Sequence, residues 1–466
     1  MKAAVTLSCP NCGFTSPVSN GQLLFACPDS KKGGQHILQK KLNHPVPIHD
    51  ETNPYLRFRE FFFSYHAAKS LDVDYNQTVL EIDSRFKKLF GKGLSATPLT
   101  KYQPGSRLSG SLWVKDETDQ LTGSHKIRHV VGSLIYQAIH KNTIKDKKLS
   151  IYSCGNAALA AAAAAKAGGR AIEVFLPDHV HPLIEKSLAS LGASTVICPR
   201  RAGETGDPSY SAFKTSLTRG SLPFSCSGPD NWSNIEGGQT LFLEITSQLQ
   251  SRNMPDNVFI QVGGGALASS GIQSLKEMLF CGKIDRLPRI FAIQTESCFP
   301  LARAYFAIYR QIAQQFNHRI CLRSTSPSDI LQYTQEHVDE ITAVTSEIAV
   351  VFDHSTVQAI LTNSLKQPSL VEPWPSIPRS IAHGILDDVT YDWYAVIRGL
   401  LETGGWPVLV SETDLKEANQ FARHLTGLPV DHTGSSGLAG LLKLSQKAAL
   451  TRNLVVFTGR DRNEHR

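Results

Sequence analysis

A lysine just after a helix-start signal is the first residue with the potential to do chemistry. Residues 121–130 read Leu-Thr-Gly-Ser-His-Lys-Ile-Arg-His-Val, and Ser or Thr in the segment 122–124 can cap a helix by accepting from its free backbone N–H groups. Lys126 then falls in the first helical turn, where the helix dipole disfavours an ordinary structural lysine. An amine held there among small residues is a candidate nucleophile. A surface lysine that happens to follow a cap is the alternative interpretation.

Two further loops combine small residues with a predicted helix start. Ser153-Cys154-Gly155-Asn156-Ala157 follows one apolar run, and its backbone N–H groups can bind a carboxylate or another anion. Gly263-Gly264-Gly265-Ala266 follows another, and three glycines let backbone N–H groups converge on a phosphate. This loop lacks the glycine spacing of a dinucleotide site and the lysine of a P-loop, so it predicts a single phosphate ester. Plain strand-to-helix turns are the alternative interpretation of both loops.

A hydroxyl closes the last apolar run of the chain. Thr458-Gly459-Arg460-Asp461 follows residues 454–457. A threonine at the end of a buried strand can offer a hydrogen bond to a buried heteroatom. This pattern gains meaning only together with the other loops.

Apolar runs bounded by turn residues alternate with helical stretches from residue 111 onward. Such runs predict strands buried on both faces, and their alternation with helices predicts parallel α/β sheets. Residues 299–380, with a proline-rich stretch at 368–378, are interpreted as an elaborated loop region or a surface subdomain. The predicted strands are 112–115, 149–153, 172–176, 195–198, 258–262, 290–294, 406–410 and 454–457, and the predicted helices include 78–90, 127–139, 157–167, 181–191, 209–218, 236–250, 269–280, 300–316, 412–425 and 438–444.

The first 45 residues are predicted to form a separate small module. Cys9-Pro-Asn-Cys12 is a C-x-x-C knuckle, and Cys27-Pro-Asp-Ser30 resembles a second knuckle whose last cysteine is a serine. His36 can supply the missing fourth ligand of a zinc site. A degenerate ribbon that holds no metal is the alternative. The predicted metal ligands are therefore Cys9, Cys12, Cys27 and His36.

Composition limits the remaining possibilities. The chain has 466 residues, which predicts two or three domains, and a net charge of +7 that is spread through the sequence. Its basic clusters are short and not interleaved with aromatic residues, which argues against a nucleic-acid partner. Nine scattered cysteines favour a reduced, intracellular setting. No apolar run is long enough for a signal peptide or a membrane span, so we expect a cytoplasmic protein without a membrane partner.

Taken in chain order, the motifs resemble the fold type II family of pyridoxal-phosphate enzymes over about residues 97–461. Residues 122–128 resemble the family's Schiff-base lysine motif, and His125-Lys126-Ile127 is similar to the tryptophan synthase β-subunit. Arg128 and the 153–157 loop are more similar to threonine synthase and threonine dehydratase. The stretches 381–385, 404–405, 435–441 and 458–459 and the cysteine-bearing ribbon are also similar to threonine synthases. Ser-Cys-Gly-Asn stands where tryptophan synthase has its catalytic glutamate loop, which argues against indole condensation.

The resemblance implies a role for each motif. It implies that Lys126 carries the cofactor as a Schiff base and moves the substrate's α-proton, and that a hydroxyl partner leaves the pyridine nitrogen largely unprotonated, which suits elimination. It also implies a carboxylate site in the 153–157 loop and a second anion site at Ser124 and Arg128, for which a surface ion pair of Arg128 is the alternative. The implied cofactor-binding residues are Lys126, Asn156, Gly263, Gly264, Gly265, Ala266 and Thr458, and the implied substrate-binding residues are Ser124, Arg128, Ser153, Gly155 and Ala157.

The family also implies an architecture and an activity. We expect two three-layer αβα domains with mostly parallel sheets: a large cofactor domain over 46–145 and 240–466, and a small α/β domain over 146–239, beside the ribbon of residues 1–45. The expected protein is a homodimer with a small amino-acid substrate. The expected activity is elimination or replacement at the β or γ carbon, in its sharpest form threonine synthesis from O-phosphohomoserine. A serine/threonine dehydratase, a cysteate synthase-like β-replacement enzyme, and a cofactor-binding scaffold without catalysis are the alternatives.

Overall fold

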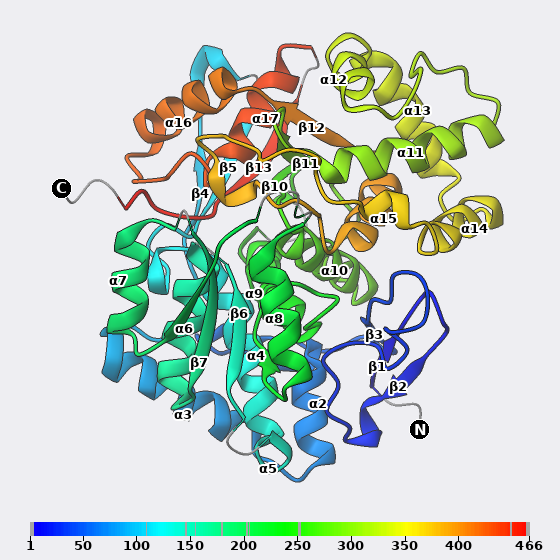
Figure 1. Ribbon diagram of the computed structural model, residues 1–466. Coiled ribbons are helices and arrows are strands. Elements are labelled where there is room, and N and C mark those ends of the chain that lie inside the picture. Colours follow the sequence, from blue (N-terminus) through cyan, green and yellow to red (C-terminus); the bar gives the residue numbers. More distant parts are fainter. Residues whose placement is uncertain are drawn as a thin grey trace.

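Two mostly parallel sheets form the frame of the molecule. The computed structural model describes residues 4–462 apart from 109, 145–146, 154, 179, 202–203, 205, 250–252 and 448–449. Its larger sheet has the strand order β12-β11-β10-β13-β5-β4, in which only the β4–β5 pair is antiparallel, and its smaller sheet has the all-parallel order β8-β7-β6-β9. Figure 1 shows the small sheet below the large one. These sheets confirm the predicted α/β fold class.

Apolar runs between turn residues form every buried strand that the sequence predicted. The strands of the large sheet are β4 (Leu99–Tyr102), β5 (Ser111–Asp116), β10 (Asn257–Gln261), β11 (Arg289–Thr295), β12 (Pro407–Val410) and β13 (Arg452–Phe457). Those of the small sheet are β6 (Leu149–Tyr152), β7 (Ile172–Pro177), β8 (Ser194–Cys198) and β9 (Leu222–Pro223). Strands β10 and β12 are buried at every position, as expected for strands covered on both faces.

Helices cover both sheets. In the large sheet α17 packs against β10 to β13, α10 packs against β10, and α15 packs against β11. In the small sheet both α6 and α8 pack against β6 and β7. The helices are α1 (Pro54–Arg57), α2 (Phe63–Ser70), α3 (Tyr75–Phe90), α4 (Lys126–Ile139), α5 (Lys141–Ile144), α6 (Asn156–Gly168), α7 (Pro182–Ser190), α8 (Pro208–Thr218), α9 (Ser233–Leu249), α10 (Ala266–Phe280), α11 (Pro300–Gln315), α12 (Pro327–Glu336), α13 (Val338–Val350), α14 (Ser355–Ser364), α15 (Trp393–Thr403), α16 (Glu412–Thr426) and α17 (Ser436–Ser445). In the described part of the chain, none of them has the length and apolarity to span a membrane.

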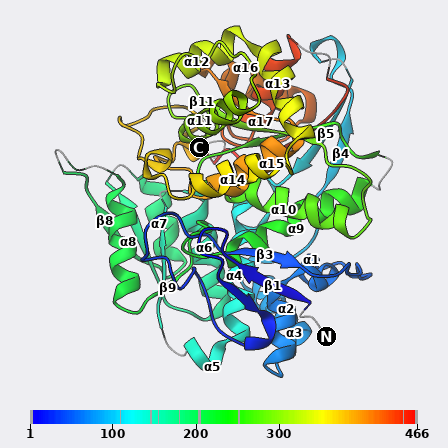
Figure 2. The same ribbon diagram turned by 90° about the vertical axis from the view of Figure 1, so that its right-hand side faces the viewer.

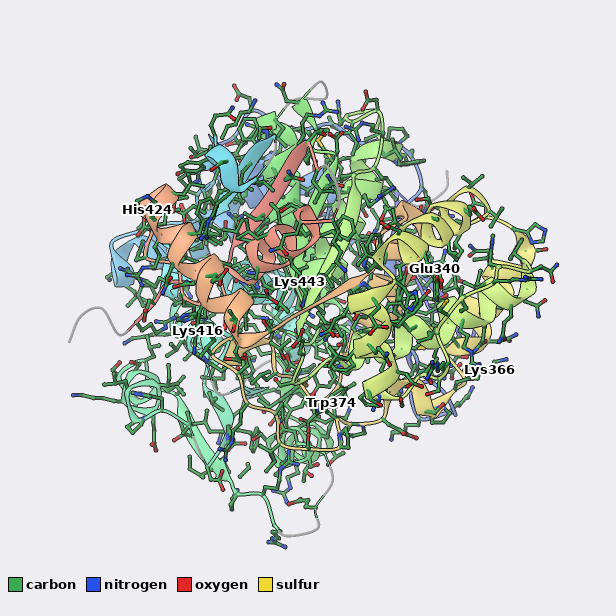
Figure 3. The ribbon with its side chains drawn as sticks, turned by 90° about the horizontal axis from the view of Figure 1, so that it is seen from above. Glu340, Lys366, Trp374, Lys416, His424 and Lys443 are labelled. Atoms are coloured by element: carbon green, nitrogen blue, oxygen red, sulfur yellow. The ribbon has the colours of Figure 1, made fainter. Side chains whose placement is uncertain are left out.

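Residues 299–380, which the sequence left as either a loop region or a subdomain, contain a helical subdomain. Helices α11 to α14 form it, and α11 packs against α14, α12 and β12. Seen from above, Glu340 on α13 and Lys366 after α14 lie on one side of the molecule, and Lys416 and His424 on α16 lie on the other (Figure 3). The segment is thus built onto the edge of the large sheet that ends in β12.

The N-terminal module is a three-stranded antiparallel sheet of order β2-β1-β3, formed by Val5–Ser8, Thr15–Pro17 and Gln39–Leu42. It packs against α2, beside the helix that begins with Lys126 (Figure 2). The buried amine of Lys40 donates to the backbone oxygen of Phe61 and pairs with Glu277 of α10 at 3.1 Å. The module is therefore joined to the rest of the chain by a buried charge as well as by apolar packing.

Two glycines let the Lys126 helix pack closely on its neighbour. Helices α4 and α9 pack side by side, and a Cβ added at Gly132 would lie 2.3 Å from the Cα of Gly237. No side chain fits in that space, so the backbones themselves form the contact. The position of α4, and with it that of Lys126, depends on both glycines.

We expect Gly132→Ala to destabilise the protein. Alanine favours helix by about 1 kcal/mol over glycine, but forced overpacking costs about 1–3 kcal/mol and here the clash is with backbone. Chemical denaturation should show a net loss of free energy of unfolding. Gly33→Ala is the control, because nothing lies within 4 Å of the added Cβ, and it should be near neutral. Equal stability of the two variants would contradict the close contact.

Candidate active site

The carboxyl ends of three neighbouring parallel strands bring the predicted loops together. Strands β5, β13 and β10 lie side by side, and parallel neighbours end at the same edge of a sheet. The chain leaving these strands carries Lys126, Thr458 and the glycines 263–265, respectively. Sheet order, rather than chain order, therefore assembles one site from distant parts of the sequence.

Backbone hydrogen bonds join the lysine motif to the C-terminal loop. The N–H of His125 donates to the carbonyl oxygen of Thr458 at 3.0 Å, and the N–H of Arg460 donates to that of Gly123 at 3.0 Å. Thr122 has a φ of 62°, which is rare for a β-branched residue and marks backbone strain. The surrounding loops therefore hold the chain before Lys126 in a conformation that it would not adopt alone.

The start of α4 differs from the prediction. The helix begins at Lys126 with His125 at the cap position, and no side chain caps it. Neither Thr122 nor Ser124 caps the helix, because the 3-10 turn Leu121–Gly123 and an extended Ser124 come before it. The buried hydroxyls of both residues have no hydrogen-bond partner among the described residues. They are thus buried polar groups without a bond of their own, on the stretch directly before Lys126.

Lys126 faces acidic groups but is bonded to none of them. Its side chain is half-buried, and among the described residues it forms no hydrogen bond or ion pair. Its charge nevertheless acts on Asp387 and Asp392, two carboxyls whose pKa values burial raises to about 6 and about 7, while Lys126 lowers both. Lys126 is therefore an amine without a fixed partner, close to the segment that covers the glycine loop.

Two buried histidines flank this amine. Burial lowers the pKa of His125 well below its ordinary value and that of His129 to about 3, and the charge of Lys126 lowers both further. Both imidazoles are therefore neutral at physiological pH. Each Nε2 is buried and has no partner in the described part of the chain.

An aspartate occupies the glycine loop. A Cβ added at Gly263 would lie 2.2 Å from Oδ2 of Asp387, and the Gly264 N–H makes a hydrogen bond that lowers the pKa of that carboxyl. Asp392 anchors the same segment through its backbone N–H, which donates to the carbonyl oxygen of Gly264 at 2.9 Å. Helix α10 begins directly after the loop without a side-chain cap. The N–H of Gly264 thus serves an anionic oxygen, which the chain's own carboxylate provides.

The hydroxyl of Thr458 is prepared as a donor. Nε2 of Gln261 lies 2.8 Å from Oγ1 of Thr458 and 2.9–3.2 Å from the carbonyl oxygens of Thr433, Gly434 and Val456. Carbonyl oxygens only accept, so the amide nitrogen faces them, and it also donates to the hydroxyl of Thr458. The proton of Thr458 therefore remains available for an acceptor placed over the sheet edge.

The start of α6 completes the site. Asn156 begins this helix after Gly155, and Arg462 donates to Oδ1 of Asn156 and to the carbonyl oxygen of Thr122, both at 2.6 Å. This leaves Nδ2 of Asn156 as a donor beside Gly459, where an added Cβ would lie 3.1 Å from it. Gly155 donates its N–H to Oγ of Ser153, Ala157 is buried in the first turn, and Cys154 lies outside the described residues.

Arg128 does not face this site, contrary to the prediction. It lies in a buried ion network in which its guanidinium bonds both carboxylate oxygens of Glu117 at 2.7 and 2.9 Å and both of Glu244 at 2.6 and 2.9 Å. Thr97 and Thr240 take further donors. A guanidinium has only five N–H donors, so none remains for a substrate anion. The surface ion pair that was the alternative interpretation is also wrong, because the network is buried.

The four predicted metal ligands lie together in the N-terminal module, away from these loops. The ligand atoms of Cys9, Cys12, Cys27 and His36 all lie within 4.8 Å of one another. Ser30, at the position of the missing cysteine, is exposed and takes no part.

Sequence reasoning missed three residues that shape the site. Gln261 is the last residue of β10 and follows three apolar residues, a position at which a polar side chain lies at the sheet edge that binds ligands. Asp387 belongs to an acidic pair close to the 381–385 stretch, and that pair was the available signal. For Arg462 the sequence offered none, because its partners Thr122 and Asn156 are brought to it only by the fold.

Comparisons with known proteins agree with this geometry. The model of the family described as pyridoxal-phosphate dependent enzyme matches residues 92–352. The chain is 24% identical to threonine synthase of Methanocaldococcus jannaschii over 342 residues, which is 73% of this chain and 67% of that protein. It is 29% identical to L-serine dehydratase of Saccharomyces cerevisiae over 194 residues, 40% of this chain and 56% of that protein.

Solved structures share the fold. Maize serine racemase matches with a TM-score of 0.55 at 17% identity, covering 84% of this chain and 94% of the racemase. Threonine deaminase from tomato, Solanum lycopersicum, in its processed form matches with a TM-score of 0.53 at 16% identity, covering 84% of this chain and 90% of the deaminase.

Arg128→Gln should destabilise the fold. The substitution leaves Glu117 and Glu244 buried without their main cation, which typically costs about 3–5 kcal/mol. Burial raises the pKa of Glu244, but the charges of Arg128 and Lys115 hold this pKa below its ordinary value. Such a carboxylate stabilises the fold above its unfolded pKa, and this contribution is lost as the pH falls through the folded pKa. Without Arg128 the carboxyl of Glu244 protonates more readily, so the deficit should shrink from pH 8 to pH 5.

Thermal and chemical denaturation of Arg128→Gln at both pH values measures this deficit. The exposed Arg219 provides a matched control, and Arg219→Gln should change the free energy of unfolding by less than about 0.5 kcal/mol. If Arg128→Gln is stable and its only defect is weak substrate binding, Arg128 contacts the substrate, and the structural role assigned to it is wrong.

Proposed function

This chain belongs to the pyridoxal-phosphate-dependent enzyme family, and we propose that it removes a leaving group from the β or γ carbon of an amino acid. The observation that carries the proposal is the hydroxyl of Thr458, whose acceptor side is filled by Gln261. A hydroxyl donates to the pyridine nitrogen without protonating it. A largely unprotonated ring favours elimination over reactions that need a long-lived carbanion.

The residues of the site fit the cofactor. The N–H groups of Gly263–Gly265 and the uncapped start of α10 suit its phosphate, since the loop already accommodates a carboxylate. Nδ2 of Asn156 and the hydroxyl of Thr458 are donors for the ring oxygen and the ring nitrogen. Lys126, which has no fixed partner among the described residues, is the amine that would bind the aldehyde.

The chain's own residues would perform the remaining tasks. Pyridoxal phosphate, when bound, supplies an aldehyde that joins amines and a ring that accepts electrons. Lys126 would take the proton from the substrate's α carbon through Nζ. The N–H groups at the start of α6, with the hydroxyls of Ser124 and Ser153, would hold the substrate carboxylate. The neutral His125 and His129 would add polar contacts without a competing charge.

Two leaving groups are compatible with this site. The buried network of Arg128 removes the cation that the sequence suggested for a substrate phosphate, which favours a β-hydroxyl, as in serine or threonine. Dehydration is therefore our first candidate. Threonine synthesis from O-phosphohomoserine is the second, because the match to a threonine synthase extends over 73% of this chain. A β-replacement enzyme would share the first step of either reaction.

Lys126→Ala should abolish both cofactor attachment and catalysis. The wild type incubated with pyridoxal phosphate should show visible absorbance that borohydride fixes to the chain at Lys126, detected by peptide mass spectrometry. The exposed Lys141, just after the same helix, provides the control, and Lys141→Ala should behave as the wild type. Activity of the Lys126→Ala variant, or labelling of another lysine, would contradict the assignment.

Product assays decide between the two candidates. Release of 2-oxo acid from serine or threonine supports dehydration, whereas release of inorganic phosphate from O-phosphohomoserine supports threonine synthesis. A bound cofactor without turnover of any of these amino acids would favour the scaffold. We also propose a cytoplasmic homodimer, for which analytical ultracentrifugation tests the oligomeric state.

Asp387→Asn should tighten cofactor binding. The carboxylate and a phosphate compete for the same N–H groups and repel each other. Burial raises the pKa of Asp387 to about 6, so the carboxyl is protonated below that pH and charged above it. The affinity advantage of Asp387→Asn over the wild type should therefore grow from pH 5.5 to pH 8, by about tenfold or more for a difference of ~1.4 kcal/mol.

Fluorescence titration with pyridoxal phosphate at several pH values measures this advantage, and the ratio of variant to wild type cancels the cofactor's own titration. Asp388→Asn is the matched control, because the carboxyl of Asp388, next to Asp387 in the chain, pairs with Arg200 at 3.4 Å. A ratio that does not change with pH would contradict the competition.

A further inference from the structure

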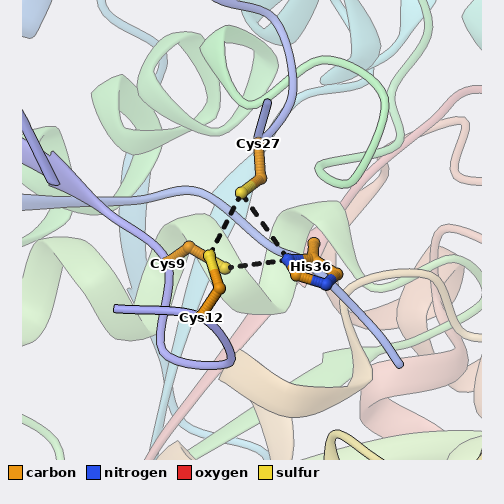
Figure 4. A group of neighbouring side chains, drawn as sticks. All are labelled: Cys9, Cys12, Cys27 and His36. Atoms are coloured by element: carbon orange, nitrogen blue, oxygen red, sulfur yellow. Dashed lines mark hydrogen bonds between the residues drawn. The ribbon is translucent and has the colours of Figure 1, made fainter. Parts of the chain in front are cut away.

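Three thiols and one imidazole of the N-terminal module point toward one centre. Cys9, Cys27 and His36 are buried, and Cys12 is exposed (Figure 4). Sγ of Cys12 lies 3.6 Å from Sγ of Cys27, and Nδ1 of His36 lies 3.7 Å from Sγ of Cys9 and 3.6 Å from Sγ of Cys27. Thiols form only weak hydrogen bonds, which gives little reason to gather three of them around an imidazole.

These separations match the edges of a zinc tetrahedron. With Zn–S of about 2.3 Å and Zn–N of about 2.0–2.1 Å, tetrahedral geometry places sulfur atoms about 3.8 Å apart and sulfur and nitrogen about 3.6 Å apart. All four ligand atoms lie within 4.8 Å of one another, so they enclose room for one ion. We propose that Cys9, Cys12, Cys27 and His36 bind one structural zinc ion. With four protein ligands, such a site has no open position for catalysis.

The local backbone explains how an incomplete pair of knuckles can close the site. The turn after Cys9 is held by the N–H of Gly13, which donates to the carbonyl oxygen of Cys9, and Gly13 takes the φ of 73° that this turn needs. The second turn begins at Cys27 in the same way, with the N–H of Ser30 donating to its carbonyl oxygen. Ser30 is exposed, and His36, later in the following loop, supplies the fourth ligand atom.

The proposed ion also connects to the catalytic part of the chain. Leu24, just before Cys27, exchanges two backbone hydrogen bonds of 3.1 Å with the hydroxyl of Tyr136, which lies on the Lys126 helix α4. Trp232, just before α9, donates its ring N–H to the carbonyl oxygen of Leu24 at 2.7 Å and its backbone N–H to that of Phe25 at 3.0 Å. Zinc would therefore fix the loop that bridges the two helices whose close packing positions Lys126.

A second group with metal-binding potential carries no such proposal. Cys321, His337 and Glu340 offer only three ligand atoms at the surface. The carboxylate of Glu340 already accepts from the backbone N–H of Cys321 at 2.8 Å and from the hydroxyl of Tyr333 at 2.6 Å. The protein itself therefore accounts for this cluster, which makes Cys321 a suitable control.

Metal analysis of the purified full-length protein tests the site. The wild type, exchanged into metal-free buffer, should retain about one zinc per chain, and Cys321→Ser should retain the same amount. Cys9→Ser and Cys27→Ser should lose it or bind at least tenfold more weakly. Wild type without zinc after incubation with zinc chloride, or full zinc content in Cys9→Ser and Cys27→Ser, would overturn the proposal.

Cobalt substitution keeps the test decisive if a cysteine variant fails to fold. The wild type loaded with Co²⁺ should show the thiolate charge-transfer and visible bands of a tetrahedral sulfur-rich site, and Cys321→Ser should show the same spectrum. Bands of a six-coordinate ion, or alkylation showing a disulfide in place of two free thiols, would refute it. Chelation of the zinc should reduce hydrogen-exchange protection of the backbone N–H groups of Leu24 and Trp232. These readouts need no substrate turnover, so they stand apart from the proposed reaction.

Discussion

A buried ion network fixes the helix on which the chemistry depends. Arg128, two residues after Lys126, bonds Glu117 at the end of β5 and Glu244 on α9, and Lys115 bonds Glu244 at 2.8 Å. All four groups are almost fully buried, so each needs the others, since an unpaired charge there costs several kcal/mol. The network permits one position of α4 relative to the sheet. Together with the contact of Gly132 and Gly237, it places the amine of Lys126 at the strand ends.

Much of this arrangement could be predicted from the sequence. The apolar runs gave the buried strands, because a strand covered on both faces must be apolar along its length. The small residues after those strands gave the loops, because close backbone approach excludes side chains. The fold class followed from the alternation of these runs with helices, and the family followed from the resemblance of the motifs to known enzymes. The place of Lys126 in the first turn of a helix was predicted correctly, although the predicted Ser or Thr cap was wrong.

The errors share a physical cause. Arg128 was assigned to a substrate because local sequence shows a charge but not its partners, and Glu244 lies on a helix far along the chain. Asp387 was missed for the same reason, since it reaches the glycine loop from a segment whose path no periodicity reveals. Long-range pairing of charged groups is decided by the tertiary fold. Apolar periodicity, by contrast, can be identified from neighbouring residues in the sequence alone.

The carboxylate of Asp387 gives the glycine loop an anionic partner from within the chain. A ligand that enters the glycine loop performs an exchange, in which one anion leaves before or as another arrives. The rate of such an exchange is limited at high ligand concentration by the departure of the aspartate segment, and so it saturates instead of rising linearly. The same segment can return when the ligand leaves, which spares the loop a period with unbonded N–H groups.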